Sequence, residues 1–278
     1  MKSIEQIIDN ALREDAPEGD VTAEALFEHE TSEAVIFAKQ DGVVSGIAVA
    51  RMVFERVDKT IMFKAIQSDG ARVEKDDVIA ILKGKTRALL KGERTALNFM
   101  ARMSGIASAT RLYVDAIEGT HAKIYDTRKT VPNLRVLDKR AVSHGGGMNH
   151  RMSLSDMALI KDNHVYAAGG VKEAVQRVKE TVPSEILVQV EVETFEQCEE
   201  ALKTDCDSIM LDNMNVDMMR RCVKASAGLK PLEASGNITL TNVLEVARTG
   251  VERISVGAIT HSVIAFDLSM RFSHKDVT

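Results

Sequence analysis

The sequence predicts an α/β protein in which an N-terminal α+β region precedes a parallel α/β barrel. Short β-rich runs, separated by turn dipeptides, lie within residues 33–84. From residue 121 onward, short apolar runs alternate with helical patterns, which is typical of parallel strands joined by crossover helices. An open doubly wound sheet has the same alternation of strands and helices. It is the second interpretation, because its strand ends are arranged less symmetrically around a ligand site.

The N-terminal region begins with a predicted helix, because residues 3–14 carry apolar side chains at helical spacing. The β-rich runs follow at 34–38, 61–66 and 77–82. Asp41-Gly42 and Asp69-Gly70 are turn signals between these runs, and the arrangement predicts antiparallel strands. Residues 86–117 then predict a mainly helical segment.

Six apolar runs predict the strands of the barrel, at 122–125, 157–160, 186–190, 208–211, 231–232 and 253–256. Helical patterns separate the later runs, at 171–182, 195–202, 216–225 and 241–247. A polar residue or a glycine closes almost every strand, about one βα unit after the previous one. Because the C-terminal ends of barrel strands converge on one mouth, these residues are expected to surround one pocket.

Basic side chains dominate the first part of this mouth. They are Arg128, Lys129, His150, Arg151 and Lys161. The chain as a whole has a net charge of −5, so a local basic cluster predicts an anionic small ligand, with two carboxylates or with a phosphate and a carboxylate. The alternative is a set of surface salt bridges with Asp126, Asp156 and Asp162.

Two acids and several small residues close the later strands. Glu191 and Asp212 suit Mg²⁺, which is usually held by one or two carboxylates together with substrate oxygens, although each acid could instead pair with a neighbouring lysine. Ser235-Gly236-Asn237 and Gly257 could form a phosphate cradle at the start of a helix, or simply tight βα turns. His261 could donate to phosphate or cap the chain after the last strand.

Composition excludes several classes of protein. No long basic stripe with interleaved aromatic residues is present, which argues against nucleic acid as a partner. No apolar run approaches the roughly 20 residues that span a bilayer, and the N-terminus lacks a signal-peptide core. Cys198, Cys206 and Cys222 show no metal or disulfide spacing, so we expect reduced thiols in a cytoplasmic protein without a membrane partner.

Seven short motifs mark the second half of the chain: DTRKT (126–130), GGGMNHR (145–151), LIKDNH (159–164), EVE (191–193), LDN (211–213), EASGNI (233–238) and SVGAITHS (255–262). GERTALNFMARMSGIA (92–107) and ED…GDVT (14–22) extend the set. Together they resemble the quinolinate phosphoribosyltransferase family, the carboxylating nicotinate-nucleotide pyrophosphorylases of NAD biosynthesis. The resemblance covers nearly the whole chain, and seven motifs in one order are very specific.

The resemblance implies a pentosyltransferase that converts quinolinate and 5-phosphoribosyl 1-pyrophosphate into nicotinate mononucleotide, pyrophosphate and CO₂. It implies an N-terminal α+β sandwich domain, residues 1–110, joined by the C-terminal tail 262–278, and an incomplete TIM-like barrel, residues 111–261. It also implies a homodimer with shared active sites, or a hexamer, in which Arg94 reaches the quinolinate of the partner subunit.

The resemblance also implies roles for the site residues. Arg128, His150 and Arg151 would hold the quinolinate carboxylates, and Lys129 and Lys161 would lie between the two substrates. Glu191 and Asp212 would lie near the ribose and Mg²⁺, so that these two acids and the two lysines form the expected catalytic set. The phosphate contacts would come from Ser235, Gly236, Asn237, Gly257 and His261.

Small departures from the family pattern occur beside the substrate, at Val131-Pro132-Asn133 and Ser143-His144. Three alternatives stay open. One is the related ModD-like group, which shares the DTRKT-type motif but lacks the lysine of LIKDNH, so Lys161 favours the quinolinate enzyme. A second is a sugar-phosphate aldolase on the same barrel, with Lys161 as a Schiff-base lysine. The third is a ligand-binding protein without turnover.

Overall fold

The computed structural model describes residues 3–273, which form two compact units. One unit comprises residues 3–111, 130–146 and 262–273, and the other comprises 112–129 and 147–261. The predicted division differs in the segment 130–146, which the structure groups with the first unit. Residues 1–2 and 274–278 of the predicted sandwich domain lie outside the described residues.

The first unit contains an antiparallel sheet with the strand order β12-β1-β5-β3. Its strands are β1 (Thr31–Ala38), β3 (Met62–Ala65), β5 (Val78–Lys85) and β12 (Leu268–Phe272). Strand β12 pairs with β1, with Ala34 opposite Phe272, so the C-terminal segment completes a sheet built from N-terminal strands. Two short strands, β2 (Gly42–Val43) and β4 (Arg72–Val73), form a separate pair. The expected antiparallel N-terminal sheet is therefore confirmed.

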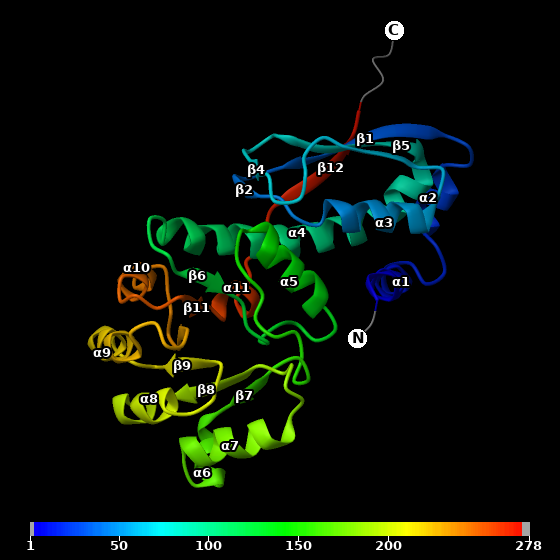
Figure 1. The fold of residues 1–278 in the computed structure, drawn as a ribbon. Helices are drawn as coiled ribbons and strands as arrows, with labels where there is room; N and C mark the ends of the chain where they lie inside the picture. Colours follow the sequence, from blue (N-terminus) through cyan, green and yellow to red (C-terminus); the bar gives the residue numbers. More distant parts are fainter. Residues whose placement is uncertain (1–2, 274–278) are drawn as a thin grey trace. The chain divides into compact units, whose positions relative to one another are not determined.

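The first unit also contains the helices α1 (Ile4–Asp15), α2 (Val21–Leu26), α3 (Ile47–Val57), most of α4 (Thr86–Ala116), and α5 (Arg135–His144). Figure 1 shows α3 and α4 running along one face of the sheet. Phe54 of α3, Leu82 of β5 and Met100 of α4 are fully buried, so the core lies between the helices and the sheet.

An ion pair inside the first unit links α5 to α4. The Asp138 side chain is fully buried and accepts two hydrogen bonds from Arg102, from Nε at 2.8 Å and from Nη2 at 2.7 Å. At the end of α5, His144 Nδ1 lies 2.7 Å from Ser45 Oγ. These contacts explain why the segment 130–146 groups with the first unit.

We expect Asp138→Ala to lower the free energy of unfolding by about 3 kcal/mol, because it leaves the partly buried Arg102 without its carboxylate. Urea unfolding followed by circular dichroism measures this change. Asp217→Ala is the matched control, since the Arg220–Asp217 pair has a similar N–O distance of 2.9 Å but an Asp217 side chain that is 91% exposed. Equal effects of the two substitutions would contradict the assignment.

The two sequence departures both lie in the first unit. Asn133 has a φ of +67°, in the left-handed region that glycine adopts readily and asparagine tolerates. His144, the other departure, makes the Ser45 hydrogen bond described above.

The second unit is built on a six-stranded sheet with the order β6-β11-β10-β9-β8-β7. Its strands are β6 (Lys123–Tyr125), β7 (Ala158–Ile160), β8 (Val188–Val192), β9 (Ser208–Asp212), β10 (Leu232–Ser235) and β11 (Arg253–Ser255). All five pairings are parallel. Strands β6 and β7 end the order, so the sheet is an incomplete TIM-like barrel, as predicted.

Helices connect these strands: α6 (Asp162–Ala168), α7 (Val171–Thr181), α8 (Phe195–Leu202), α9 (Val216–Ser226), α10 (Val243–Ala247) and α11 (Ala258–His261). Figure 1 shows them alternating with the strands around the unit. Cys198, Cys206 and Cys222 are free and buried. Within residues 3–273, no helix combines the length and the apolar character needed to cross a bilayer.

Strand β8 shows how the barrel carries polar groups in its interior. All five of its residues are buried, and successive side chains point to opposite faces of a strand. Gln189 and Glu191 therefore share one face, while the valines at 188, 190 and 192 share the other. A polar pair on a fully buried strand needs partners inside the barrel.

Candidate active site

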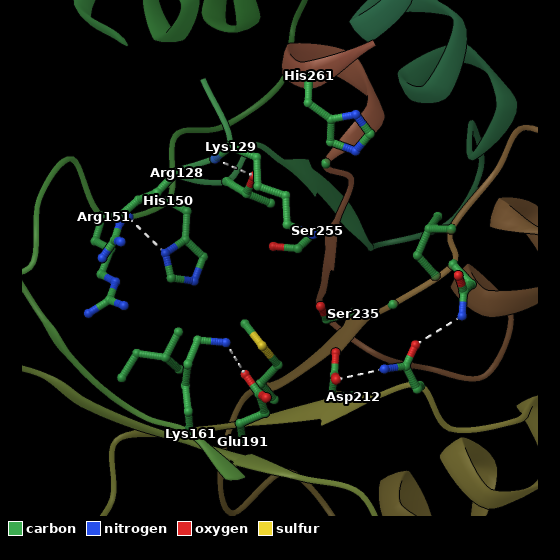
Figure 2. A pocket seen from close by; sticks show the side chains of 18 of the residues that line it. Arg128, Lys129, His150, Arg151, Lys161, Glu191, Asp212, Ser235, Ser255 and His261 are labelled. Atoms are coloured by element: carbon green, nitrogen blue, oxygen red, sulfur yellow. Dashed lines mark hydrogen bonds and ion pairs between the residues drawn. The ribbon is translucent and has the colours of Figure 1, made fainter. Parts of the chain in front are cut away.

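A cavity of about 750 Å³ lies at the C-terminal ends of the barrel strands, entirely within the second unit. Twelve of the thirteen predicted site residues line it: Arg128, Lys129, His150, Arg151, Lys161, Glu191, Asp212, Ser235, Gly236, Asn237, Gly257 and His261. Figure 2 shows His150 and Arg151 on one side of the cavity and Asp212 and Ser235 on the other. Arg94 is exposed on α4 and is not among the lining residues.

The basic side of the cavity is organised by a buried aspartate. Asp126 follows β6, is fully buried, and accepts the backbone N–H of His150 through Oδ1 at 2.8 Å. Asp156 accepts the backbone N–H groups of Met152 and Ser153, both at 2.8 Å, in the loop that leads to β7. These two acids therefore shape the loop that carries His150 and Arg151.

Arg151 is partly buried and lies near a second cation, Arg128. Its Nη1 donates to the carbonyl oxygen of Met157 at 3.0 Å. Burial lowers the pKa of the Arg151 guanidinium, the nearby positive charge of Arg128 lowers it further, and Asp156 opposes the shift. Arginine stays charged at neutral pH despite such a shift, so two partly desolvated cations lie near each other. An anion bound between them would relieve this repulsion.

Lys161 and Glu191 form an ion pair across the cavity floor. Lys161 Nζ lies 2.9 Å from Glu191 Oε2, and the Glu191 side chain is only 7% exposed. The alternative given for this acid, a pairing with a neighbouring lysine, is therefore present. Asp212 differs, because its Oδ2 accepts a hydrogen bond from Asn213 Nδ2 at 2.8 Å.

The chemistry of these donors fits Mg²⁺ only in part. Glu191 and Asp212 offer carboxylate oxygens, the donors that Mg²⁺ prefers. Within residues 3–273, no group of three or more His, Cys, Asp or Glu side chains could hold a metal ion by itself. An ion at this position would therefore need further oxygens from a substrate, which is the usual mode of Mg²⁺ in phosphate-binding sites.

Two left-handed asparagines and a glycine form the opposite wall. Asn213 and Asn237 both have φ +53°, and Gly236 has φ +88°. Asn237 Nδ2 donates to Asn213 Oδ1 at 3.0 Å, and a Cβ on Gly236 would lie 2.1 Å from the same oxygen. Only glycine fits there. Helix α10 begins at Val243, so this turn does not open a helix directly, in contrast to the expectation.

Gly257 lies where the basic side of the cavity meets the opposite wall. A Cβ at this position would lie 3.1 Å from the His261 ring and 3.4 Å from Lys129 Cδ. Lys129 therefore lies beside the end of β11 and between the two halves of the cavity. Helix α11, only four residues long, starts directly after Gly257.

Sequence reasoning missed the buried polar groups beneath the cavity. Gln189 and Glu233 are fully buried, and Gln189 Nε2 donates to Glu233 Oε2 at 2.9 Å. Gln189 Oε1 in turn lies 3.1 Å from His150 Nε2. Gln189 and Glu233 each interrupt a mostly apolar strand. A polar residue at such a position needs a buried partner, and this is the sequence signal that could have revealed them.

Comparison with known proteins agrees with this geometry. The family model for the quinolinate phosphoribosyl transferase C-terminal domain matches residues 106–271, and the model for the N-terminal domain matches residues 20–104. A probable nicotinate-nucleotide pyrophosphorylase (carboxylating) of Bacillus subtilis is 40% identical over 96% of this chain and 92% of its own length. A quinolinate phosphoribosyltransferase (decarboxylating) of Nicotiana tabacum is 44% identical over 95% of this chain and 81% of its own.

Solved structures show the same fold. The crystal structure of NadC from Streptococcus pyogenes superposes with a TM-score of 0.94 and 38% identity, covering 98% of this chain and 97% of that one. Both halves of the chain match family models, and the curated relatives align over nearly its whole length. The chain belongs to the quinolinate phosphoribosyltransferase family.

Proposed function

We propose that this chain transfers the phosphoribosyl group of 5-phosphoribosyl 1-pyrophosphate to quinolinate and releases pyrophosphate and CO₂. The product is nicotinate mononucleotide, and the enzyme is a pentosyltransferase of NAD biosynthesis. The observation that carries the proposal is one cavity with a basic half at His150 and Arg151 and an opposite half at Asp212 and Ser235. The names of its relatives support the same reaction.

The basic half suits the quinolinate dianion. Arg128 and Arg151 present planar forks that match carboxylates, and their mutual repulsion falls when a dianion binds between them. Lys129 and Lys161 add charge on the side that faces the second substrate. Where bound substrates displace water from the cavity, these contacts would be stronger than on an open surface.

The transfer itself needs no covalent enzyme intermediate. The bond from the ribose C1 to pyrophosphate breaks as the pyridine nitrogen forms its bond to C1. Glu191 and Asp212 can stabilise the positive charge that C1 acquires. The ring nitrogen is then cationic, so the adjacent carboxylate leaves as CO₂, its electron pair stays on the ring carbon, and that carbon takes up a proton.

We propose that Glu191 and Asp212 also hold Mg²⁺ together with oxygens of the phosphoribosyl donor. When bound, the ion would offset the negative charge of the departing pyrophosphate. Ser235, Gly236, Asn237, Gly257 and His261 would bind the phosphates from the opposite wall.

A pyrophosphate-release assay tests the proposed function directly. We expect release with quinolinate plus the phosphoribosyl donor, and little with nicotinate, which has one carboxylate fewer. A ligand-binding protein would bind quinolinate without release. An aldolase would form an adduct at Lys161 that borohydride traps.

We expect Gly236→Ala to lower turnover by about 100-fold, because the new Cβ would displace Asn213 and misplace the phosphate wall. Gly228→Ala is the matched control. Gly228 also has a positive φ, +80°, but a Cβ there meets nothing within 4 Å. The control should lose about 1 kcal/mol of stability to backbone strain and keep its turnover. If both variants lost turnover equally, strain and not the phosphate wall would explain the effect.

We also propose a homodimer with shared active sites. Arg94 belongs to the GERT motif, is exposed on α4, and does not line the cavity of its own chain. Arg94 of the partner subunit would supply a further cation to bound quinolinate.

A further inference from the structure

A charged carboxylate lies directly beneath the cavity. Glu233 of β10 is fully buried and is not among the lining residues. Ser255 Oγ donates to its Oε1 at 2.5 Å, Gln189 Nε2 donates to its Oε2 at 2.9 Å, and His150 Nε2 lies 3.5 Å from Oε1. Because Ser255 and His150 both line the cavity, Glu233 connects its two sides from below.

The carboxylate is held in its charged form. Burial raises the pKa of Glu233, but the interactions with His150, Ser255 and Gln189 outweigh burial, so the pKa lies below the ordinary value. Replacing a buried charged group and its partners by apolar residues is often neutral or stabilising. Fold stability alone is therefore a weak reason for a charge here, and the groups that the charge orients are more informative.

A carboxylate can only accept hydrogen bonds, which sets the direction of each neighbouring bond. Gln189 must present its amide NH₂ to Glu233, so its carbonyl oxygen Oε1 faces His150 Nε2 at 3.1 Å. His150 must then carry its proton on Nε2. That leaves the lone pair of His150 Nδ1 to accept the backbone N–H of Arg151, which donates to it at 2.8 Å.

The series of bonds ends on a cation of the substrate site. Arg151 is held at its backbone by His150 Nδ1 and at its guanidinium by the carbonyl oxygen of Met157. If the His150 proton moved to Nδ1, two N–H groups would face each other and the Arg151 backbone would lose this position.

We propose that Glu233 is a positioning residue for the quinolinate half of the site, which fixes the tautomer of His150 through Gln189 and the backbone of Arg151 through His150. The expected effect of Glu233 on KM for quinolinate rests on the function proposed above, whereas the expected tautomer of His150 does not depend on that function.

Glu233→Gln tests the inference without a change of shape. The carbonyl oxygen of the new amide keeps the hydrogen bond from Ser255 Oγ, so its NH₂ faces Gln189, whose amide turns and presents its own NH₂ to His150 Nε2. The proton of His150 is then expected on Nδ1. Nitrogen-15 NMR of histidine-labelled protein distinguishes the two tautomers, and His150→Asn identifies the His150 signals among the seven histidines. The wild type should show the Nε2–H form and Glu233→Gln should not.

Kinetics then separates positioning from a general loss of structure. We expect Glu233→Gln to raise KM for quinolinate by about 10- to 100-fold, while KM for the phosphoribosyl donor stays within about twofold. The exchange variant Glu233→Gln with Gln189→Glu is the matched control. It returns a carboxylate that accepts from His150 Nε2 and an amide that accepts from Ser255, so the Nε2–H signal and the KM for quinolinate should both recover.

Two outcomes would overturn the inference. One is a folded Glu233→Gln variant with an unchanged His150 spectrum, and the other is an equal rise of KM for both substrates. If Glu233→Gln does not fold, Gln189→Met removes the hydrogen bonds that connect Glu233 to His150. An unchanged His150 spectrum in that variant would also overturn the inference. Absence of pyrophosphate release by the wild type would refute the proposed function. It would not refute the positioning of His150 by Glu233, which the NMR measurement tests independently.

Discussion

Lys161→Ala is expected to lower turnover by about 100- to 1,000-fold while the protein stays folded. Lys161 Nζ is the cation that engages Glu191 at 2.9 Å on the cavity floor, and its side chain is 49% exposed, so it is accessible to a ligand. Without it, the two substrates lose a positive charge between them, and Glu191 loses its partner. Steady-state pyrophosphate release measures turnover, and a thermal melt reports the fold.

Arg128→Ala should act on the same reaction from the quinolinate side, with a similar loss in kcat/KM for quinolinate. Lys172→Ala is the control for both variants, because Lys172 is an exposed lysine on α7 and does not line the cavity. Near-wild-type kcat/KM in both Lys161→Ala and Arg128→Ala would refute the assignment of the cavity as the active site.

Mixing two inactive variants should restore activity if the active site is shared between subunits. Arg94→Ala and Lys161→Ala would each be inactive alone as homodimers. After subunit exchange, half of the dimers would be mixed, and each mixed dimer would have one intact site out of two. Activity should therefore recover to about one quarter of the wild-type value in a twofold symmetric dimer.

The matched control for subunit exchange is a mixture of Lys161→Ala with Arg128→Ala. Both residues line the cavity of one chain, so every mixed dimer keeps two damaged cavities, and no activity should return. Native mass spectrometry verifies that mixed dimers form in both experiments. Mixed dimers of Arg94→Ala and Lys161→Ala without activity would contradict the shared site.

The barrel could be predicted from sequence because short apolar runs mark its strands, and a polar or small residue follows almost every run. The predicted run 208–211 corresponds to β9 (Ser208–Asp212), and the run 253–256 corresponds to β11 (Arg253–Ser255). Convergence of parallel strand ends then placed Lys161, Glu191 and Asp212 at one mouth, where the structure has them.

Helix α3 (Ile47–Val57) was missed because its start signal is not local. Gly46 at its N-cap offers no side chain. The capping oxygens come from Asp69, which accepts the backbone N–H of Ile47 at 2.9 Å and of Ala48 at 3.4 Å. A cap supplied from a distant loop leaves no signature in the sequence next to the helix.

Helix α5 (Arg135–His144) was missed for a different reason. Asp138 and Lys139 are buried, so its inward face carries charges where an amphipathic pattern would have apolar residues. The partner that makes Asp138 tolerable, Arg102, is on another helix. Only the tertiary structure brings the two together.

The hydrogen bonds that link Glu233 through Gln189 to His150 could not be predicted from the residues that close the strands. Gln189 and Glu233 precede the ends of β8 and β10, and their function depends on β8, β10 and β11 belonging to one sheet, in which β9 lies between β8 and β10. Residues that close parallel strands face the mouth of the barrel. The buried groups beneath them, which set the direction of the hydrogen bonds, lie one or more residues earlier in the strands and are not marked in this way.

The most direct test of the two-substrate cavity is the ratio of its two small products. Quinolinate labelled in the carboxylate next to the ring nitrogen is incubated with the enzyme, Mg²⁺ and the phosphoribosyl donor, and CO₂ and pyrophosphate are both quantified. We predict equal amounts of the two products, and neither of them when one substrate is omitted. Release of CO₂ without the donor, or of pyrophosphate without quinolinate, would contradict a reaction in which transfer drives decarboxylation in one cavity.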